Sequence, residues 1–168
     1  MINDMERSIE SQCLSLITRQ QPIAGDLRMI SAALKVVTDI ERIGDQTADI
    51  AELMLRLRDC DLDAYSRHIT GMLQVAKEIV HDAVGAFVNR DSRAADEGIR
   101  HDDVVDELFA KVKDDLVHML QEGVDNIDAC VDVLMIAKYL ERIGDHAVNI
   151  AEWEIFQESG AIQHIRLM

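Results

Sequence analysis

The sequence contains few of the residues that build β-structure or interrupt helices. It has a single proline, Pro22, and aromatic residues make up only 4% of its 168 positions. Sandwiches and barrels need many short strands, rich in β-branched and aromatic residues and separated by turns. Alanine, leucine, methionine and charged helix formers are abundant instead, so the composition favours helices and argues against a sandwich or barrel.

Positive charge is also scarce. The chain has 17 lysine and arginine residues against 32 aspartate and glutamate residues, and its formal net charge is −15. A nucleic-acid-binding protein needs a basic surface to replace the counterions of the phosphate backbone, so we expect no nucleic-acid partner. An acidic surface suits cation binding, or is simply a well-hydrated surface.

Two further absences concern the cellular compartment. Cys13, Cys60 and Cys130 are far apart and form no C-x-x-C pair, which suggests a reducing environment rather than a disulfide framework or a zinc site. The sequence has no apolar run of about 18 residues and no basic segment followed by an apolar run at its start. We therefore expect a cytoplasmic protein that is neither secreted nor membrane-spanning.

The apolar residues that are present follow a helical period. Pro22 ends the first apolar stripe, because proline disfavours helix in the residue before it. Asp91 is a good N-cap for a helix that begins at residue 92, and Gly123 is a good terminator for the same helix. Short polar connections such as residues 59–63 indicate antiparallel neighbours, so we expect an all-α fold of antiparallel helical bundles. The periodicity predicts five helices, over about 2–20, 26–57, 69–89, 92–123 and 126 to beyond 153.

The most informative feature is an internal duplication. Glu-Arg-Ile-Gly-Asp occurs at 41–45 and again at 141–145, and Ile-Ala-Glu follows each copy at the same distance. Eight of the twelve positions from 41 to 52 match those from 141 to 152. The preceding helices align too, with Ile2 on Val105. Since a supersecondary unit has been used twice, we expect two halves with a pseudo-twofold relation.

The duplicated segment places carboxylates along one face of a helix. At about 100° per residue, Glu41 and Asp45 lie about 40° apart, beside the apolar residues that face the core. A single i, i+4 pair of carboxylates usually lies on a solvent-exposed helix face, where the two like charges repel slightly. Its recurrence at Glu141 and Asp145, in an identical frame, indicates a metal site.

A second helix adds ligands to the later copy. Asp102 and Asp106 form another i, i+4 pair on the helix that precedes it, whereas Asn3 occupies the position equivalent to Asp106. Oxygen ligands from facing helices suit iron, manganese, magnesium or calcium, and they disfavour a structural zinc site without excluding zinc. The second-half group is the more complete. The candidate metal ligands are Glu41, Asp45, Asp102, Asp106, Glu141 and Asp145.

Each copy also contains a glycine in strongly helical sequence. Gly44 and Gly144 each cost about 1 kcal/mol relative to alanine in a helix interior. The structural interpretation is a close approach of two helices. The functional interpretation is access of a ligand to the carboxylates, and both can hold together.

These segments resemble the PhoU family, whose repeats carry an acidic E(D)-x-x-x-D motif. Both Glu-Arg-Ile-Gly-Asp frames, both Ile-Ala-Glu extensions, residues 5–13 and the Gln-Gln-Pro segment at 20–22 resemble its pattern, which covers essentially the whole chain. The resemblance implies two tandem three-helix bundles that often dimerise and that bind metal ions, in some members iron clusters, on the acidic motifs.

The same resemblance implies a function without enzymatic activity. Family members are negative regulators of phosphate uptake and of the phosphate-starvation response. They act by protein–protein interaction and join a phosphate ABC transporter, through its ATPase, to a sensor histidine kinase at the inner face of the membrane. We therefore expect a regulator that associates with the membrane only through its partners.

The chain departs from the family pattern at its start, where the family's first helix has no counterpart. We expect residues 1–60 to form an incomplete first repeat of two helices and residues 61–168 to form a three-helix second repeat. An apolar stripe of the first half would then face water, to be covered by a second copy in a homodimer or by an upstream helix. Its expected members are Ile9, Cys13, Leu16, Ile30, Val37 and Leu55.

Two alternatives stay open. One is a PhoU-like regulatory module of a sodium-phosphate cotransporter. The other is a di-iron carboxylate enzyme, which needs Glu-x-x-His motifs on two helices of a bundle. The chain has Glu78 with His81 and Asp115 with His118, but neither pair lies in the repeat. His146 has no copy in the first half, so we interpret it as a non-ligand.

Overall fold

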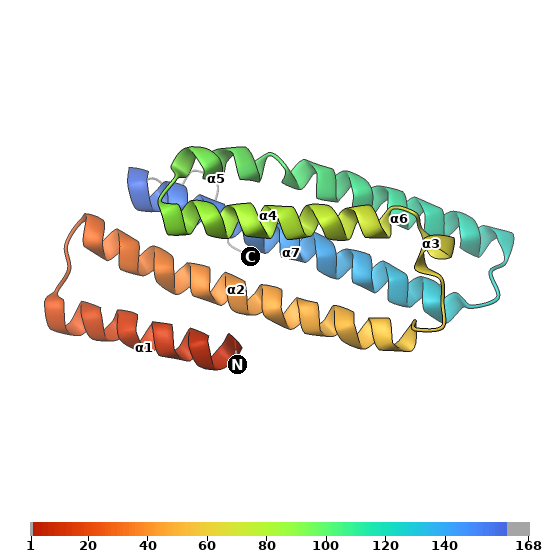
Figure 1. Ribbon diagram of the computed structural model, residues 1–168, viewed down its shortest axis with the longest axis horizontal. Helices are drawn as coiled ribbons and strands as arrows, with labels where there is room; N and C mark the ends of the chain where they lie inside the picture. The colour runs from red at the N-terminus through yellow and green to blue at the C-terminus, as the bar shows by residue number, and fades with distance from the viewer. Residues whose placement is uncertain (1, 161–168) are drawn as a thin grey trace.

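The fold is entirely helical over the part of the chain that the structure, a computed structural model, describes, which is residues 2–160. No strand occurs in that range, and each long helix runs antiparallel to the long helix before it in the chain, so the predicted all-α fold is confirmed (Figure 1). No helix within it has both the length and the apolar character needed to cross a membrane. The helices are α1 (Ile2–Gln20), α2 (Gly25–Arg56), α3 (Leu62–Tyr65), α4 (Ile69–Asn89), α5 (Ser92–Ile99), α6 (Asp102–Glu122) and α7 (Ile127–Ser159).

Side-chain caps fix where several helices begin and end. The Asp91 side chain accepts a hydrogen bond from the Ala94 N–H at 3.0 Å and so caps α5, as the sequence predicts. Asn126 caps α7 in the same way. Gly123 ends α6 with a φ of 88°, a left-handed conformation that favours glycine.

Two connections differ from the predicted ones. The polar break after α2 runs into the single turn of α3, and the predicted continuous helix over 92–123 is wrong, because the chain breaks between α5 and α6. Gly98, a weak helix former, lies at this break, and its carbonyl accepts a hydrogen bond from the His101 N–H at 3.1 Å. This i to i+3 bond tightens the chain into a turn, and a new helix begins at Asp102.

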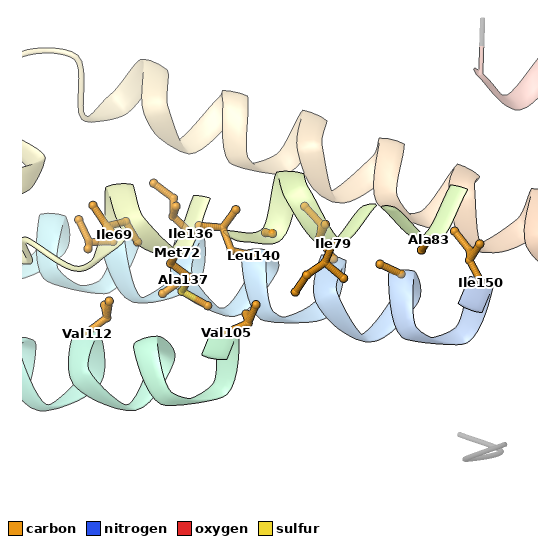
Figure 2. Close-up of a cluster of buried hydrophobic side chains, with 14 of the residues drawn as sticks. Ile69, Met72, Ile79, Ala83, Val105, Val112, Ile136, Ala137, Leu140 and Ile150 are labelled. Carbon is orange, nitrogen blue, oxygen red and sulfur yellow. The ribbon is translucent and has the colours of Figure 1, made fainter. Parts of the chain in front are cut away.

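The hydrophobic core is built around α7. Helices α2, α4, α5 and α6 all pack against it, and Figure 1 shows α1 farther out, beside α2. Figure 2 shows Met72 of α4, Val105 of α6 and Ala137 of α7 meeting in this core, and each is fully buried. Burying a side chain of the size of Met72 or Val105 stabilises the fold by about 1.5–3 kcal/mol.

The first half has a thinner core. Cys13, Ile30 and Val37 are buried, so the prediction that they face water was wrong. Helix α1 packs directly on α2, and these residues lie within the hairpin that the two helices form. Ile9, Leu16 and Leu55 are exposed, as expected, and the exposed fraction of Leu55 reaches 73%.

Candidate metal site

The two copies of the duplicated segment lie on α2 and α7, the two longest helices. The first copy, 41–45, is near the middle of α2, and the second, 141–145, is near the middle of α7. These helices run antiparallel and form the most extensive helix–helix contact of the molecule (Figure 1). The copies therefore occupy equivalent places on equivalent helices.

Both motif glycines lie where another helix approaches closely. A Cβ atom on Gly144 would lie 2.8 Å from Asp102 Oδ1 and 3.7 Å from the γ-carbons of Val105, closer to the carboxylate than real Cβ atoms come. A Cβ atom on Gly44 would lie 2.8 Å from the Ile2 side chain, and Ile2 aligns with Val105 in the repeat. Glycine permits close packing in both copies, and in the second copy it also makes room for a carboxylate.

Four acidic side chains come together where α6 begins beside α7. We call Asp102, Asp106, Glu141 and Asp145 the second-half carboxylates. Burial raises the pKa of Asp102 to about 6, and repulsion from Asp106, Asp145 and Glu141 adds to the rise. Burial, followed by the charge of Glu141, also raises the pKa of Asp145. Negative charge on the neighbouring carboxylates thus disfavours ionisation of Asp102 and Asp145, and a cation bound among them would reduce this repulsion.

Glu141 already has a cationic partner. Lys138 Nζ lies 2.6 Å from both carboxylate oxygens of Glu141, one turn earlier on α7. Among the described residues, no three carboxylate, histidine or cysteine side chains converge closely enough to enclose an ion as they stand. The oxygen donors nevertheless have the chemistry that a hard cation needs, and Glu141 would join them by turning away from Lys138.

The first-half pair lies in different surroundings. Glu41 Oε1 accepts a hydrogen bond from Asn3 Nδ2 at 3.2 Å, and its other oxygen lies 3.7 Å from Arg42 Nε. Asp45 is half exposed and lies 3.9 Å from the same arginine. Asn3 takes the place that Asp106 has in the second half, so this group offers two carboxylates rather than four.

Comparison with known proteins assigns the family. Residues 1–54 and 69–153 match the PhoU domain. The chain belongs to the PhoU family. It is 36% identical, over 95% of its length, to a phosphate-specific transport system accessory protein PhoU homologue of Clostridium acetobutylicum, and it covers 74% of that protein. It is 38% identical over 98% of its length to the homologue of Aquifex aeolicus and covers 76% of it.

Solved PhoU structures share the fold. The crystal structure of PhoU from Pseudomonas aeruginosa superposes with a TM-score of 0.86 at 34% identity, covering 95% of this chain and 77% of that one. The phosphate transport system regulatory protein PhoU from Streptococcus pneumoniae superposes with a TM-score of 0.89 at 24% identity, over 98% and 77% of the two chains. PhoU proteins are regulatory accessory proteins rather than enzymes, and so is this chain.

A polar contact that the sequence did not reveal links the two PhoU motifs. His146 Nδ1 lies 2.8 Å from Asp39 Oδ1, and Asn149 Nδ2 donates to the same oxygen at 3.3 Å. His146, which we interpreted only as a non-ligand, therefore joins α7 to α2 directly beside both motifs. The first copy has Gln46 at the position equivalent to His146, and this difference between the copies was the only sign in the sequence that His146 has a role of its own.

The Glu-x-x-His and Asp-x-x-His pairs lie away from the PhoU motifs. Glu78 and His81 are exposed on α4, where His81 Nδ1 contacts Asp82 at 3.2 Å. Asp115 accepts a hydrogen bond from Ser66 Oγ at 2.9 Å. Ser66 Oγ in turn accepts a hydrogen bond from the His68 N–H, next to the start of α4. Glu78 and His81 therefore lie on the surface, and Asp115 takes part in the hydrogen bonds at the start of α4, so the two pairs do not form an internal di-iron ligand set.

Proposed function

We propose that this PhoU protein is a negative regulator of phosphate uptake and of the phosphate-starvation response. It acts in the cytoplasm by contacting the ATPase of a phosphate ABC transporter and a sensor histidine kinase, and it reaches the membrane only through them. The observation that carries the proposal is similarity over nearly the whole chain to accessory proteins of phosphate-specific transport systems, at 36% and 38% identity.

We further propose that the second-half carboxylates hold a divalent or trivalent cation. Their donor atoms are all oxygens, which suits iron, manganese, magnesium or calcium and leaves zinc the least suited of the candidate ions. Gly144 leaves space for Asp102 beside the motif, and Asp106 extends the group along α6. A bound cation would supply the positive charge that these neighbouring carboxylates lack. Glu41 and Asp45 would form a second, weaker site.

We also propose that the protein is a homodimer of two-repeat chains. Residues 1–60 would form the incomplete repeat and 61–168 the three-helix repeat, although residue 1 and residues 161–168 lie outside the described range. The exposed apolar residues of α1 and α2 support an association through the first half, because apolar surface left in water is unfavourable.

Deleting the gene in its host tests the regulatory role. We expect phosphate-uptake genes to be expressed even in phosphate-rich medium, and an intact copy of the gene to restore repression. The purified protein should turn over no phosphate compound. Unchanged repression in the deletion strain would contradict the proposal. Co-purification with a sodium-phosphate cotransporter instead of an ABC-transporter ATPase would identify the alternative partner.

A further inference from the structure

Lys138 occupies the place in which a cation would neutralise Glu141. Its ammonium lies 2.6 Å from both Glu141 oxygens, and the carboxylate is largely buried whereas the lysine is about half exposed. Charge-assisted hydrogen bonds of this length are among the stronger ones in proteins. Glu141 is therefore engaged through both of its oxygens and is not free to accept another cation.

The facing helix also holds the lysine. Lys138 Nζ lies 5.5 Å from the ring centroid of Phe109 on α6, within the range of a cation–π attraction. The ammonium thus pairs with Glu141 from a position between α6 and α7.

The internal repeat shows that this lysine is specific to the second half. Thr38 stands at the equivalent position of α2, and its hydroxyl donates to the Leu34 carbonyl of its own helix at 3.1 Å. Glu41 receives a hydrogen bond from the neutral Asn3 instead. A lysine is therefore present only in the copy that has the larger set of carboxylates.

We propose that Lys138 is an internal competitor for the cation, which binds the second-half carboxylates only by displacing the lysine from Glu141. This inference rests on the proposed cation site and adds the residue that sets its affinity. Without a cation, the ammonium limits the repulsion between the carboxylates. When a cation binds, Glu141 rotates toward it and the half-exposed lysine moves into solvent.

Calorimetric titration of the metal-stripped full chain with Mn²⁺ tests the proposal. Lys138→Thr, which introduces the residue of the first half, should bind Mn²⁺ about tenfold more tightly than wild type or better, because no charge-assisted pair has to break. Lys138→Gln is a second neutral variant with the same expectation. Lys138→Arg keeps the charge and should retain the wild-type affinity within about twofold.

The matched control is Lys77→Thr, which removes the same charge from an exposed position on α4 and should leave the affinity unchanged. Equal or weaker binding by both neutral Lys138 variants, or equal tightening by Lys77→Thr, would overturn the role of Lys138. In that case loss of binding in Glu141→Ala and Asp145→Ala would still support the site. Absence of Mn²⁺ binding in every protein, Lys138→Thr included, would overturn both the inference and the proposed site.

Discussion

Glu154 is a carboxylate that the protein keeps in its interior. It lies on α7, is 1% exposed and accepts a hydrogen bond from Gln157 Nε2 at 3.4 Å. Burial raises its pKa from an ordinary 4.5 to about 7; the charge of Glu158 adds to the rise and that of Arg90 opposes it. At neutral pH the fold therefore holds a group that is only partly ionised.

Glu154 should make stability depend on pH. The unfolded chain releases this proton near pH 4.5 and the folded chain near pH 7, so the folded state binds more protons between these values. The contribution of Glu154 to the free energy of unfolding therefore falls as pH rises through that window, by about 1.4 kcal/mol per pH unit. Glu154→Gln removes this pH-dependent contribution to the free energy of unfolding, because glutamine does not ionise.

Urea denaturation at several pH values measures the effect. We expect the stability of Glu154→Gln relative to wild type to rise between pH 4.5 and about 7 and to level off above it. Glu158→Gln, at an exposed neighbouring position, should show a much smaller change. A difference between Glu154→Gln and wild type that stays constant across the range would contradict this assignment.

At the scale of helices, the contact between α2 and α7 joins the two halves through pairs of unequal burial. Asp39 and His146 are largely buried and lie 2.8 Å apart. Arg56 and Asp132 also pair across the two helices, but the arginine is mostly exposed. Solvent weakens the exposed pair, so the buried pair should contribute more to the association of the halves.

Double-mutant cycles compare the two pairs. The cycle of Asp39→Ala with His146→Ala should give a coupling free energy of about 1–2 kcal/mol in urea denaturation, because the pair is largely buried and either substitution removes the contact between the two side chains. The cycle of Arg56→Ala with Asp132→Ala should give less than about 1 kcal/mol. Coupling near zero for Asp39 and His146 would show that this contact does not hold the halves together.

The sequence predicted well those helices whose position is set by residues close together in the chain. Apolar spacing located the long helices, and Asp91 marked the start of α5 through its capping side chain. The break before Asp102 was missed, because the apolar stripe continues across it and the turn is held by backbone hydrogen bonds to the Gly98 carbonyl. Periodicity alone did not distinguish one long helix from two.

The sequence identified the candidate carboxylates but not the side chains that contact them. The repeat identified the carboxylates, since they recur in an identical frame. The pairing of His146 with Asp39, more than 100 residues away, depends on how α2 and α7 cross. Lys138 and His146 differ from their repeat equivalents Thr38 and Gln46, and these differences were the available indication.

At the scale of the whole molecule, the exposed apolar surface of the first half bears on assembly. Ile9 and Leu16 on α1 and Leu55 on α2 face water in the isolated chain, and α1 packs at the edge of the bundle (Figure 1). At about 25 cal/mol per Å², covering several such side chains would contribute several kcal/mol to association. We therefore expect a symmetric homodimer.

Light scattering at micromolar concentration should give twice the mass of one chain. Leu16→Glu should shift the protein toward the monomer, because it places a charge in the proposed contact. Leu73→Glu is the control, since Leu73 is exposed to a similar extent but lies on α4 in the other half. A well-behaved wild-type monomer would show that no second copy covers the first half.

The central claim is that the second-half carboxylates bind a cation, and the metal content of purified protein tests it most directly. Wild type, Glu141→Ala and Asp145→Ala are purified without chelator, together with Glu107→Ala, which removes an exposed carboxylate of α6 outside the group. We expect wild type and Glu107→Ala to carry the same metal, and Glu141→Ala and Asp145→Ala to have lost most of it. Equal metal content in all four proteins would contradict the claim.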